Sequence, residues 1–378
     1  MQEVIEGCQY YKKIMGGGGK ERNSNFELFR IILMLLIIAH HYVVNSGLTN
    51  LYDFNHITGN MVFLQLFGMF GKTVINCFSL ITGYFMIASR ITVRKFLKTY
   101  LEIKFYSLVF YLIFLFSGYE LFSVKKLIKT VFNVVYGVGN GYTGTYMIFF
   151  LFIPFLNVLA INLTKSQYEK LLVLSLFYFT VISTFFLHDT FNFTGWMMVC
   201  YFIGGYIRLY PNSFFNEKKI AVIGLSISLI LMSASIIGVD FIGARLGFIA
   251  YDHMVVDSHK FLALTCSVFS FLFFKNLNLR HNRIINQIAS STFGILLIHA
   301  NSDAMRRFLW QNLLKNTTFY DSNILILHAF LSVCVVYIVG LAIDQLRIIF
   351  IEKPLFRYFE NASWIDGLEK KLMKRSND

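Results

Sequence analysis

Residues 23–44 read NSNFELFRIILMLLIIAHHYVV, and this stretch decides the fold class. It is mostly apolar and about 20 residues long, which is the length a helix needs to cross a hydrocarbon core of about 30 Å. Its charged and imidazole groups lie near the two ends, with Glu27 and Arg30 at one end and His40 and His41 at the other. The stretch therefore predicts a transmembrane helix.

Similar apolar runs recur along the whole chain of 378 residues. Hydrophobic residues make up 56% of the chain and charged residues only 15%, whereas about a quarter of a typical soluble domain is charged. These runs are continuous and lack the alternating pattern of barrel strands, so helices must satisfy the backbone in lipid. We predict an all-α polytopic transmembrane helix bundle of about ten spans, at residues 27–46, 60–88, 101–118, 142–163, 169–187, 194–210, 219–238, 260–275, 284–302 and 321–350.

The chain is strongly basic, with 34 Lys and Arg residues against 21 Asp and Glu and a net charge of +13. In a soluble protein this charge would suggest nucleic acid, but in a membrane protein basic residues mark cytoplasmic loops. With ten spans, 24 of the basic residues fall on one side and eight on the other. We therefore predict no nucleic-acid partner, and both termini in the cytoplasm.

The chain divides into three predicted parts: a flexible, glycine-containing cytoplasmic arm at residues 1–25, a transmembrane domain at residues 26–358 and a basic cytoplasmic tail at residues 359–378. The span at 60–88 is too long for one straight crossing and contains Lys72 and several glycines, so we expect a tilted, broken or cavity-facing helix. Residues 121–136 alternate lysine with apolar residues at helical spacing, which predicts an amphipathic helix at the outer interface. The five cysteines form no CxxC pair, and we predict no metal site.

Polar groups inside a span are costly, so the first span holds the strongest functional candidates. Glu27 and Arg30 are neighbours on one helical face, and either Ser24 or Asn25 is placed to cap the helix. Arg30 and His41 share a face and are about 16 Å apart along the axis. The alternative is that Arg30 extends to the headgroups and that the histidines merely sit at the outer interface.

Five stretches of the chain, in order, resemble the acyltransferase 3 family of bacterial membrane O-acyltransferases. The first is the arginine, ten residues and histidine of FELFRIILMLLIIAHHY, which here are Arg30 and His41. The others are NCFSLITGYFMI with Tyr84, TYMIFFLFIPFLN with Tyr146, SSTFGILLIHAN with His299, and IEKPLFR near the end of the transmembrane domain. The resemblance covers residues 24 to about 358.

The chain departs from the family pattern at one place. Many members carry two arginines three residues apart on the cytoplasmic side after the second span, whereas this chain reads VRKFLKTYLEIKFYS. If that pair holds the donor's phosphates, then Arg94, Lys95 and Lys98 must do so differently, because lysine binds phosphate as a point charge without the arginine fork.

The resemblance implies an acyltransferase of the bacterial cytoplasmic (inner) membrane. It would transfer an acyl group, commonly acetyl, from cytoplasmic acyl-CoA to a hydroxyl of a cell-surface polysaccharide or lipid-linked sugar. Acyl-CoA would be a donor substrate, with no resident cofactor. His41 would deprotonate the acceptor or carry the acyl group, Arg30 would bind the donor, and Glu27 would orient Arg30. His299, Tyr84 and Tyr146 are further candidates.

A transporter or flippase for a glycan or lipid-linked sugar is the alternative from another class. It would share the span count and the buried polar groups. The pairing of Arg30 with His41 favours the enzyme, because a carrier needs no acid–base group at that spacing.

Overall fold

The computed structural model describes residues 22–360 apart from 88, 90–91, 133–141, 187, 189, 248–249, 251 and 256. Most of the predicted arm and nearly all of the predicted tail lie outside the described residues. Every regular element in the described part is a helix, which confirms the all-α prediction. The elements are α2 (Ser24–Val44), η1 (Leu48–Leu51), α3 (Gly59–Gly68), α4 (Gly71–Met86), α5 (Val93–Phe116), α6 (Val124–Phe132), α7 (Tyr142–Asn162), α8 (Lys165–Leu176), η2 (Phe177–Ile182), α9 (Ser183–Phe185), α10 (Phe193–Leu209), α11 (Ser213–Asn216), α12 (Lys218–Leu246), α13 (Phe261–Lys275), α14 (Arg283–Ala289), α15 (Thr292–His299), α16 (Asp303–Arg306), η3 (Arg307–Leu313), η4 (Asn316–Phe319), α17 (Leu325–Arg347), η5 (Ile348–Glu352) and α18 (Lys353–Glu360).

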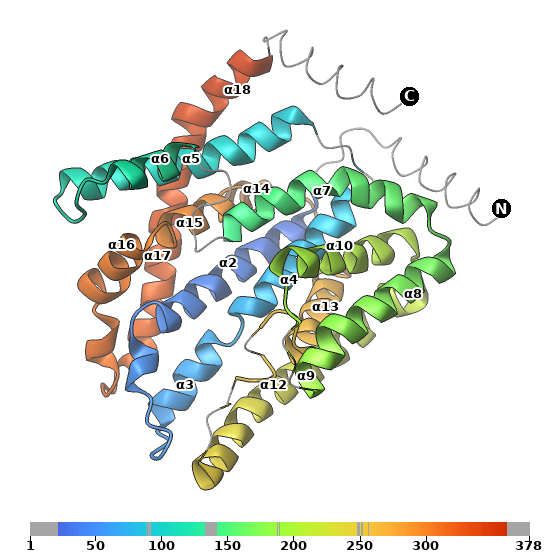
Figure 1. Ribbon diagram of the computed structural model, residues 1–378, viewed down its shortest axis with the longest axis horizontal. Helices are drawn as coiled ribbons and strands as arrows, with labels where there is room; N and C mark the ends of the chain where they lie inside the picture. The colour runs from blue at the N-terminus through green and yellow to red at the C-terminus, as the bar shows by residue number, and fades with distance from the viewer. Residues whose placement is uncertain are drawn as a thin grey trace.

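Helix α2 lies in the middle of the molecule, where it contacts α3, α4, α13, α14, α15 and α17 (Figure 1). Asn23 caps it, because its side chain accepts a hydrogen bond from the Asn25 backbone N–H at 3.0 Å. Ser24 and Asn25, the caps predicted from the sequence, are not the N-cap. The Ser24 hydroxyl donates to the Asn286 side chain, and the Asn25 side chain donates to the Leu277 carbonyl. These contacts fix the start of α2 to the segment around α14.

Among the described residues, seven helical segments are long and apolar enough to cross a membrane. They match seven of the ten predicted spans. The other three predicted spans coincide with shorter helices, namely α10, α13 and the pair α14–α15, which have 17, 15, 7 and 8 residues. The number of crossings therefore stays a prediction.

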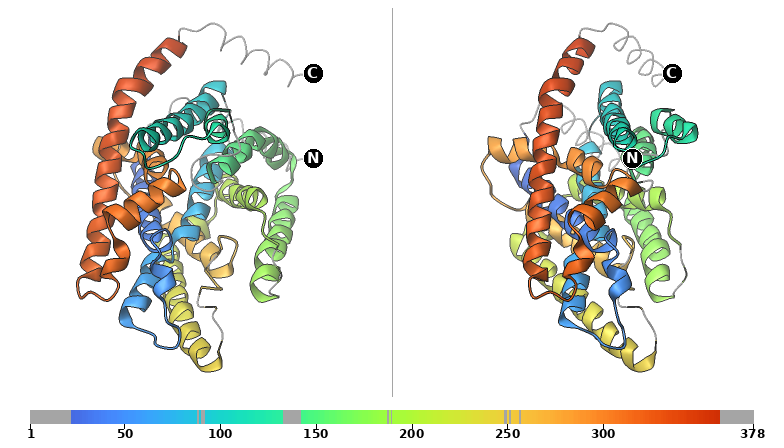
Figure 2. Two further views of the ribbon diagram at one scale, coloured as in Figure 1. Left: turned by 60° about the vertical axis from the view of Figure 1, so that its left-hand side comes forward. Right: turned by 90° about the vertical axis from the view of Figure 1, so that its left-hand side faces the viewer.

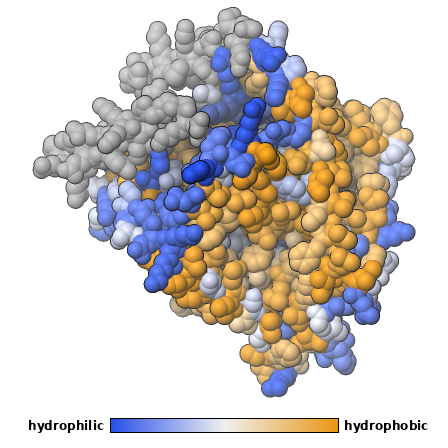
Figure 3. Space-filling view, turned by 180° about the vertical axis from the view of Figure 1, so that it is seen from behind, coloured by the Kyte–Doolittle hydropathy of each residue, from blue (hydrophilic) through white to orange (hydrophobic). Residues whose placement is uncertain are grey.

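Apolar side chains remain exposed over much of the surface, as membrane-spanning helices require. Exposed examples are Phe155 on α7, Ile230 on α12 and Ile338 on α17. Viewed from behind, hydrophobic residues cover a broad area, and hydrophilic ones gather mainly toward its margins (Figure 3). Such a surface is stable against lipid tails and not against water.

Segments that the charge count assigns to one side do contact one another. Gln287 on α14 bonds to Gln345 near the end of α17, and Glu352 just beyond pairs with Lys98 on α5 at 2.5 Å. Lys275 donates to the Asn216 side chain at 2.7 Å across two further segments of that side. The helical rod of α17 and α18 runs along one flank and ends at the same end as the start of α5 (Figure 2).

The long second span is broken, which is one of the three possibilities that the sequence left open. Helix α3 ends at Gly68 and α4 begins at Gly71. After the break, the backbones of α4 and α10 are in contact. A Cβ at Gly83 would lie 2.1 Å from the Tyr201 carbonyl oxygen. A Cβ at Gly204 would likewise lie 2.3 Å from the Leu80 carbonyl oxygen. Only glycine fits at these two positions without moving a helix.

The predicted amphipathic helix is partly described. Helix α6 covers Val124–Phe132, and residues 133–136 lie outside the described part. The helix exposes both apolar and basic side chains, and Lys126 pairs with Glu120. Its place at the outer interface stays a prediction.

Candidate active site

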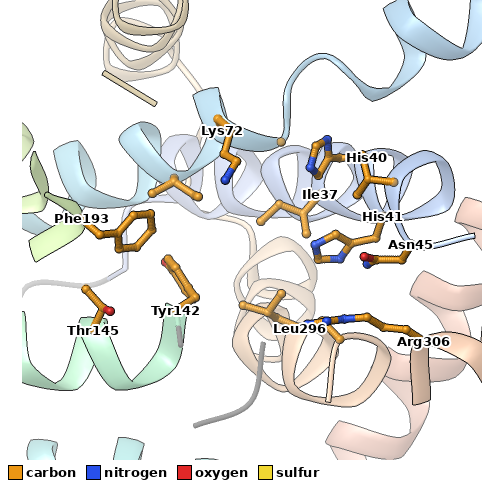
Figure 4. Close-up of a pocket in the computed structure, with 14 residues that line it drawn as sticks. Ile37, His40, His41, Asn45, Lys72, Tyr142, Thr145, Phe193, Leu296 and Arg306 are labelled. Carbon is orange, nitrogen blue, oxygen red and sulfur yellow. The ribbon is translucent and has the colours of Figure 1, made fainter. Parts of the chain in front are cut away.

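A cavity of about 480 Å³ opens beside the second half of α2. Its walls come mainly from α2, α4, α7, α10 and α15 (Figure 4). The lining residues are Ile37, His40, His41, Val44, Asn45, Gly71, Lys72, Ile75, Tyr142, Thr145, Phe193, Leu296, Ala300 and Arg306. A space of this size falls in the range that binds small molecules.

His41 and His299 meet at this cavity. The His41 Nδ1 atom lies 3.0 Å from the His299 Nε2 atom, and the two ring centroids are 5.1 Å apart. His299 is buried at the end of α15, with 1% of its surface exposed. His41 presents its ring to the cavity, so His299 supports His41 from behind.

Hydrogen bonds on the two rings determine where their protons lie. His299 Nδ1 is 2.6 Å from the Ile295 carbonyl oxygen, which can only accept, so Nδ1 carries the proton. In a neutral His299, Nε2 is then an acceptor, and His41 Nδ1 must donate to it. A neutral His41 therefore has an unprotonated Nε2, which is the form of imidazole that acts as a base.

His40 occupies a different wall of the cavity. Its Nδ1 atom lies 2.6 Å from the Gly68 carbonyl oxygen, one of the carbonyls left unpaired where α3 ends. A Cβ at Gly71 would lie 2.2 Å from the His40 ring, so glycine is required where α4 begins. His40 thus holds the helix break in place, which is a more specific position than the interfacial one expected from the sequence.

Glu27 and Arg30 form the expected pair near the other end of α2. Arg30 Nη1 donates to Glu27 Oε1 at 3.0 Å. The Glu27 side chain is 6% exposed and that of Arg30 32%, so the guanidinium keeps access to a ligand. Within the part of the chain that the structure describes, Glu27 Oε2 is buried without a hydrogen-bond partner.

The two candidate tyrosines lie in different environments. Tyr146 is one turn from Tyr142 on α7, with ring centroids 6.4 Å apart, and Tyr142 lines the cavity. Tyr84 lies on α4 away from the lining residues, where its hydroxyl accepts a hydrogen bond from Arg208 at 3.2 Å. Tyr146 is therefore beside the cavity wall, whereas Tyr84 anchors a basic side chain.

The three basic candidates for donor binding all stand in the first two turns of α5. None of them lines the cavity at His41. Lys98 pairs with Glu352 at 2.5 Å, and Glu352 also accepts from Arg347 Nη1 at 2.8 Å. Arg347 further binds Glu102 at 3.0 Å and Asp344 at 2.8 Å, so a buried ionic cluster ties α5 to the end of α17.

The two cations that line the cavity, Lys72 and Arg306, were not among the site residues predicted from the sequence. Lys72 is a cation within an apolar span, which is a signal for function by itself. Arg306 stands in a region that the charge count assigns to an outer loop, and nothing in the local sequence shows that it reaches a cavity. The sequence therefore carries a signal for Lys72 and none for Arg306.

Within the described part of the chain, no group of three or more His, Cys, Asp or Glu side chains is arranged to hold a metal ion. His259, just before the start of α13, hydrogen-bonds the Ser183 hydroxyl at 2.6 Å. The cavity offers imidazole, amide, hydroxyl, phenol, amine and guanidinium groups. These groups suit acid–base chemistry on an organic substrate.

Comparison with known proteins identifies the family of the chain. Neither the curated proteins nor the solved structures contain a match to the chain. The family model Acyl_transf_3, described as an acyltransferase domain, matches residues 23–344, which is well over half of the chain. This match runs from the cap of α2 to the buried cluster at the end of α17 and includes His41 and His299, and the chain therefore belongs to the acyltransferase 3 family.

Proposed function

We propose that the protein transfers an acyl group, in particular acetyl, from cytoplasmic acyl-CoA to a hydroxyl of a cell-surface polysaccharide or lipid-linked sugar. Membership of an acyltransferase family supports the reaction class. The observation that carries the mechanism is the bond between His41 Nδ1 and His299 Nε2, which leaves His41 Nε2 as a base on the cavity wall. An alcohol is a weak nucleophile at neutral pH and needs such a base.

The proposed reaction uses this base. His41 Nε2 takes the proton of the acceptor hydroxyl while the oxygen attacks the thioester carbonyl carbon. The carbon–sulfur bond breaks, and the thiolate of CoA leaves with the proton returned from His41. In the alternative order, Nε2 attacks the thioester carbon, the carbon–sulfur bond breaks and CoA leaves as the thiolate. The acceptor hydroxyl then attacks the acyl-histidine, the bond from the acyl carbon to Nε2 breaks, and the hydroxyl proton passes through the freed Nε2 to the thiolate.

His299 acts as a positioning residue in either order. It holds the His41 ring through Nε2, and the Ile295 carbonyl in turn holds His299. A buried group that fixes the tautomer and orientation of a catalytic histidine is a recurring device in acyl-transfer enzymes. In many such enzymes a carboxylate orients the catalytic histidine, and in this proposal His299 does so.

We assign the donor's phosphates to the end of α2 that carries Arg30. Arg30 is half-exposed and braced by Glu27, and a guanidinium binds phosphate with two parallel hydrogen bonds. With Arg30 on the cytoplasmic side, the thioester would reach His41 about 16 Å farther along the helix. Arg94, Lys95 and Lys98 supply further positive charge on the same side in this proposal, which also places both termini in the cytoplasm.

The experiment measures labelled acetyl from acetyl-CoA in base-labile form on membrane and surface glycans. It compares cells carrying the wild type, His41→Ala, Arg30→Ala or no protein, at matched protein abundance. We expect label with the wild type only. Equal labelling with both variants would refute the roles of His41 and Arg30, and absence of label in every strain would favour the transporter.

A further inference from the structure

The cavity beside His41 is lined by two cations and by no carboxylate. Lys72 reaches it from α4 and Arg306 from the end of α16, and none of the lining residues is Asp or Glu. In Figure 4 the His41 ring lies between the Lys72 and Arg306 side chains. The space in which the acceptor hydroxyl meets His41 is therefore positively charged.

Neither cation has a buried counter-charge among the residues that the structure describes. Lys72 makes no hydrogen bond or ion pair in the described part of the chain. Arg306 donates from Nη1 to Asp303 Oδ1 at 2.8 Å, but the Asp303 side chain is 73% exposed and that of Arg306 only 12%. The Arg306 Nε atom is buried and has no hydrogen-bond partner among the described residues.

A cation held in a membrane-embedded protein without a buried counter-charge is costly unless a ligand supplies that charge. We propose that the acceptor carries an anionic group, a carboxylate or a phosphate, which Lys72 and Arg306 hold while a neighbouring hydroxyl faces His41. This inference rests on the proposed function and names the class of acceptor. Arg306 offers a planar fork that matches either anion, and Lys72 adds a point charge.

The donor is a poor source for this anion. In an acyl-CoA the pantetheine arm separates the phosphates from the thioester, and the thioester must reach His41. Lys72 and Arg306 line the same small cavity as His41, so they lie where the reacting end of the donor arrives. Arg30, eleven residues before His41 on the same helix, is about 16 Å away and fits the phosphates better.

The rest of the cavity suits a sugar that bears such a group. Tyr142 and Phe193 form an aromatic wall, with ring centroids 6.0 Å apart. Asn45 and Thr145 provide polar groups for ring hydroxyls. A mostly apolar wall with a few polar groups is the usual composition of a small-molecule site.

The first test determines the charge of the native acceptor. Membranes of the source cells, with the gene deleted or restored, receive labelled acetyl-CoA, and the smallest labelled glycan fragment is separated by anion exchange. We expect retention of that fragment on the anion exchanger. Loss of retention after chemical reduction of carboxyl groups identifies an acidic sugar, and loss after removal of phosphate identifies a phosphorylated one. A neutral fragment overturns this inference and leaves the proposed function intact. If restoring the gene adds no labelled fragment, both are overturned.

The second test connects the charge to the two residues. At saturating acyl-CoA, Lys72→Met and Arg306→Gln should each raise the acceptor KM by about tenfold or more and change kcat less, because each removes a charge-assisted bond. Lys72→Arg should retain most of the affinity, and Arg307→Gln is the matched control, since Arg307 is exposed next to Arg306. An unchanged KM in both charge-removing variants, or a fall in kcat alone, would contradict acceptor binding by these cations.

Discussion

The Nδ1 atom of His41 lies 3.0 Å from the Nε2 atom of His299, although 258 positions separate the two residues in the sequence. One histidine faces the cavity, and the other is buried behind it and bound to the Ile295 carbonyl. The pair explains why a neutral His41 presents an unprotonated nitrogen to the cavity. It also makes the role of His299 testable apart from that of His41.

His299→Leu should lower kcat by about tenfold to a hundredfold, because the His41 ring loses the partner that fixes its tautomer. His299→Gln should recover much of the loss, since the glutamine side-chain oxygen can accept from His41 Nδ1. Purified protein assayed for acyl transfer at matched folded fraction provides the comparison. Equal activity losses in Leu and Gln variants would point to packing alone.

Rapid denaturation at neutral pH, where an acyl-histidine survives longer than in acid, separates the two orders of reaction. If His41 carries the acyl group, protein incubated with labelled acyl-CoA and no acceptor should retain about one label per chain, and His41→Ala should retain none. The label should move to acceptor on addition. If His41 acts only as a base, the wild type retains no more label than His41→Ala, while steady-state transfer still requires His41.

Glu27→Gln should raise the KM for acyl-CoA several-fold with little change in kcat, because the hydrogen bond to Arg30 survives without its charge. If Glu27 acts through Arg30, the double variant Glu27→Gln, Arg30→Ala should resemble Arg30→Ala alone. Fully additive losses would show that Glu27 contributes independently. The KM for acyl-CoA of all three variants is measured by varying the acyl-CoA concentration at a fixed acceptor concentration.

Gly83→Ala should destabilise the protein by about 1–3 kcal/mol, because the added Cβ would lie 2.1 Å from the Tyr201 carbonyl oxygen and push α4 away from α10. Gly238→Ala on α12 is the control, since a Cβ there meets nothing within 4 Å. That change should be neutral or stabilise by about 0.5–1 kcal/mol. Thermal unfolding in detergent compares them, and similar midpoints would argue against close α4–α10 packing.

Arg347→Met should cost about 3–5 kcal/mol, because it leaves the carboxylates of Glu102, Asp344 and Glu352 without their shared cation. Arg357→Met removes an exposed arginine a few turns later and should change stability by no more than about 0.5 kcal/mol. Folded yield and unfolding temperature report both. Two variants of equal stability would mean that the buried cluster is not structural.

Features set by local spacing could be predicted from the sequence. The 3.6-residue period places Glu27 beside Arg30, and the structure contains that ion pair. The excess length and glycines of residues 60–88 indicate a tilted, broken or cavity-facing helix, and the structure has a break between Gly68 and Gly71. Both follow from intervals of a few residues, for which helix geometry is sufficient.

Features set by long-range packing could not be derived in this way. Family resemblance made His299 a candidate, but no spacing rule brings it to His41. Lys98 belongs to the predicted donor cluster, yet the fold pairs it with Glu352. Charge counting assigned Arg306 to an outer loop, because a count of basic residues does not show which of them point into a cavity.

Arg30 and His41 stand on one unbroken helix, Ser24–Val44. Their separation is therefore a property of the backbone and does not depend on how neighbouring helices pack. Insertion of one residue between them would rotate His41 by about 100° and shift it by about 1.5 Å, which would aim the ring away from both His299 and the cavity. In the proposed mechanism, helix α2 is thus a fixed spacer, and the donors that it admits are those whose anchored end and reactive end are separated by the length between these two side chains.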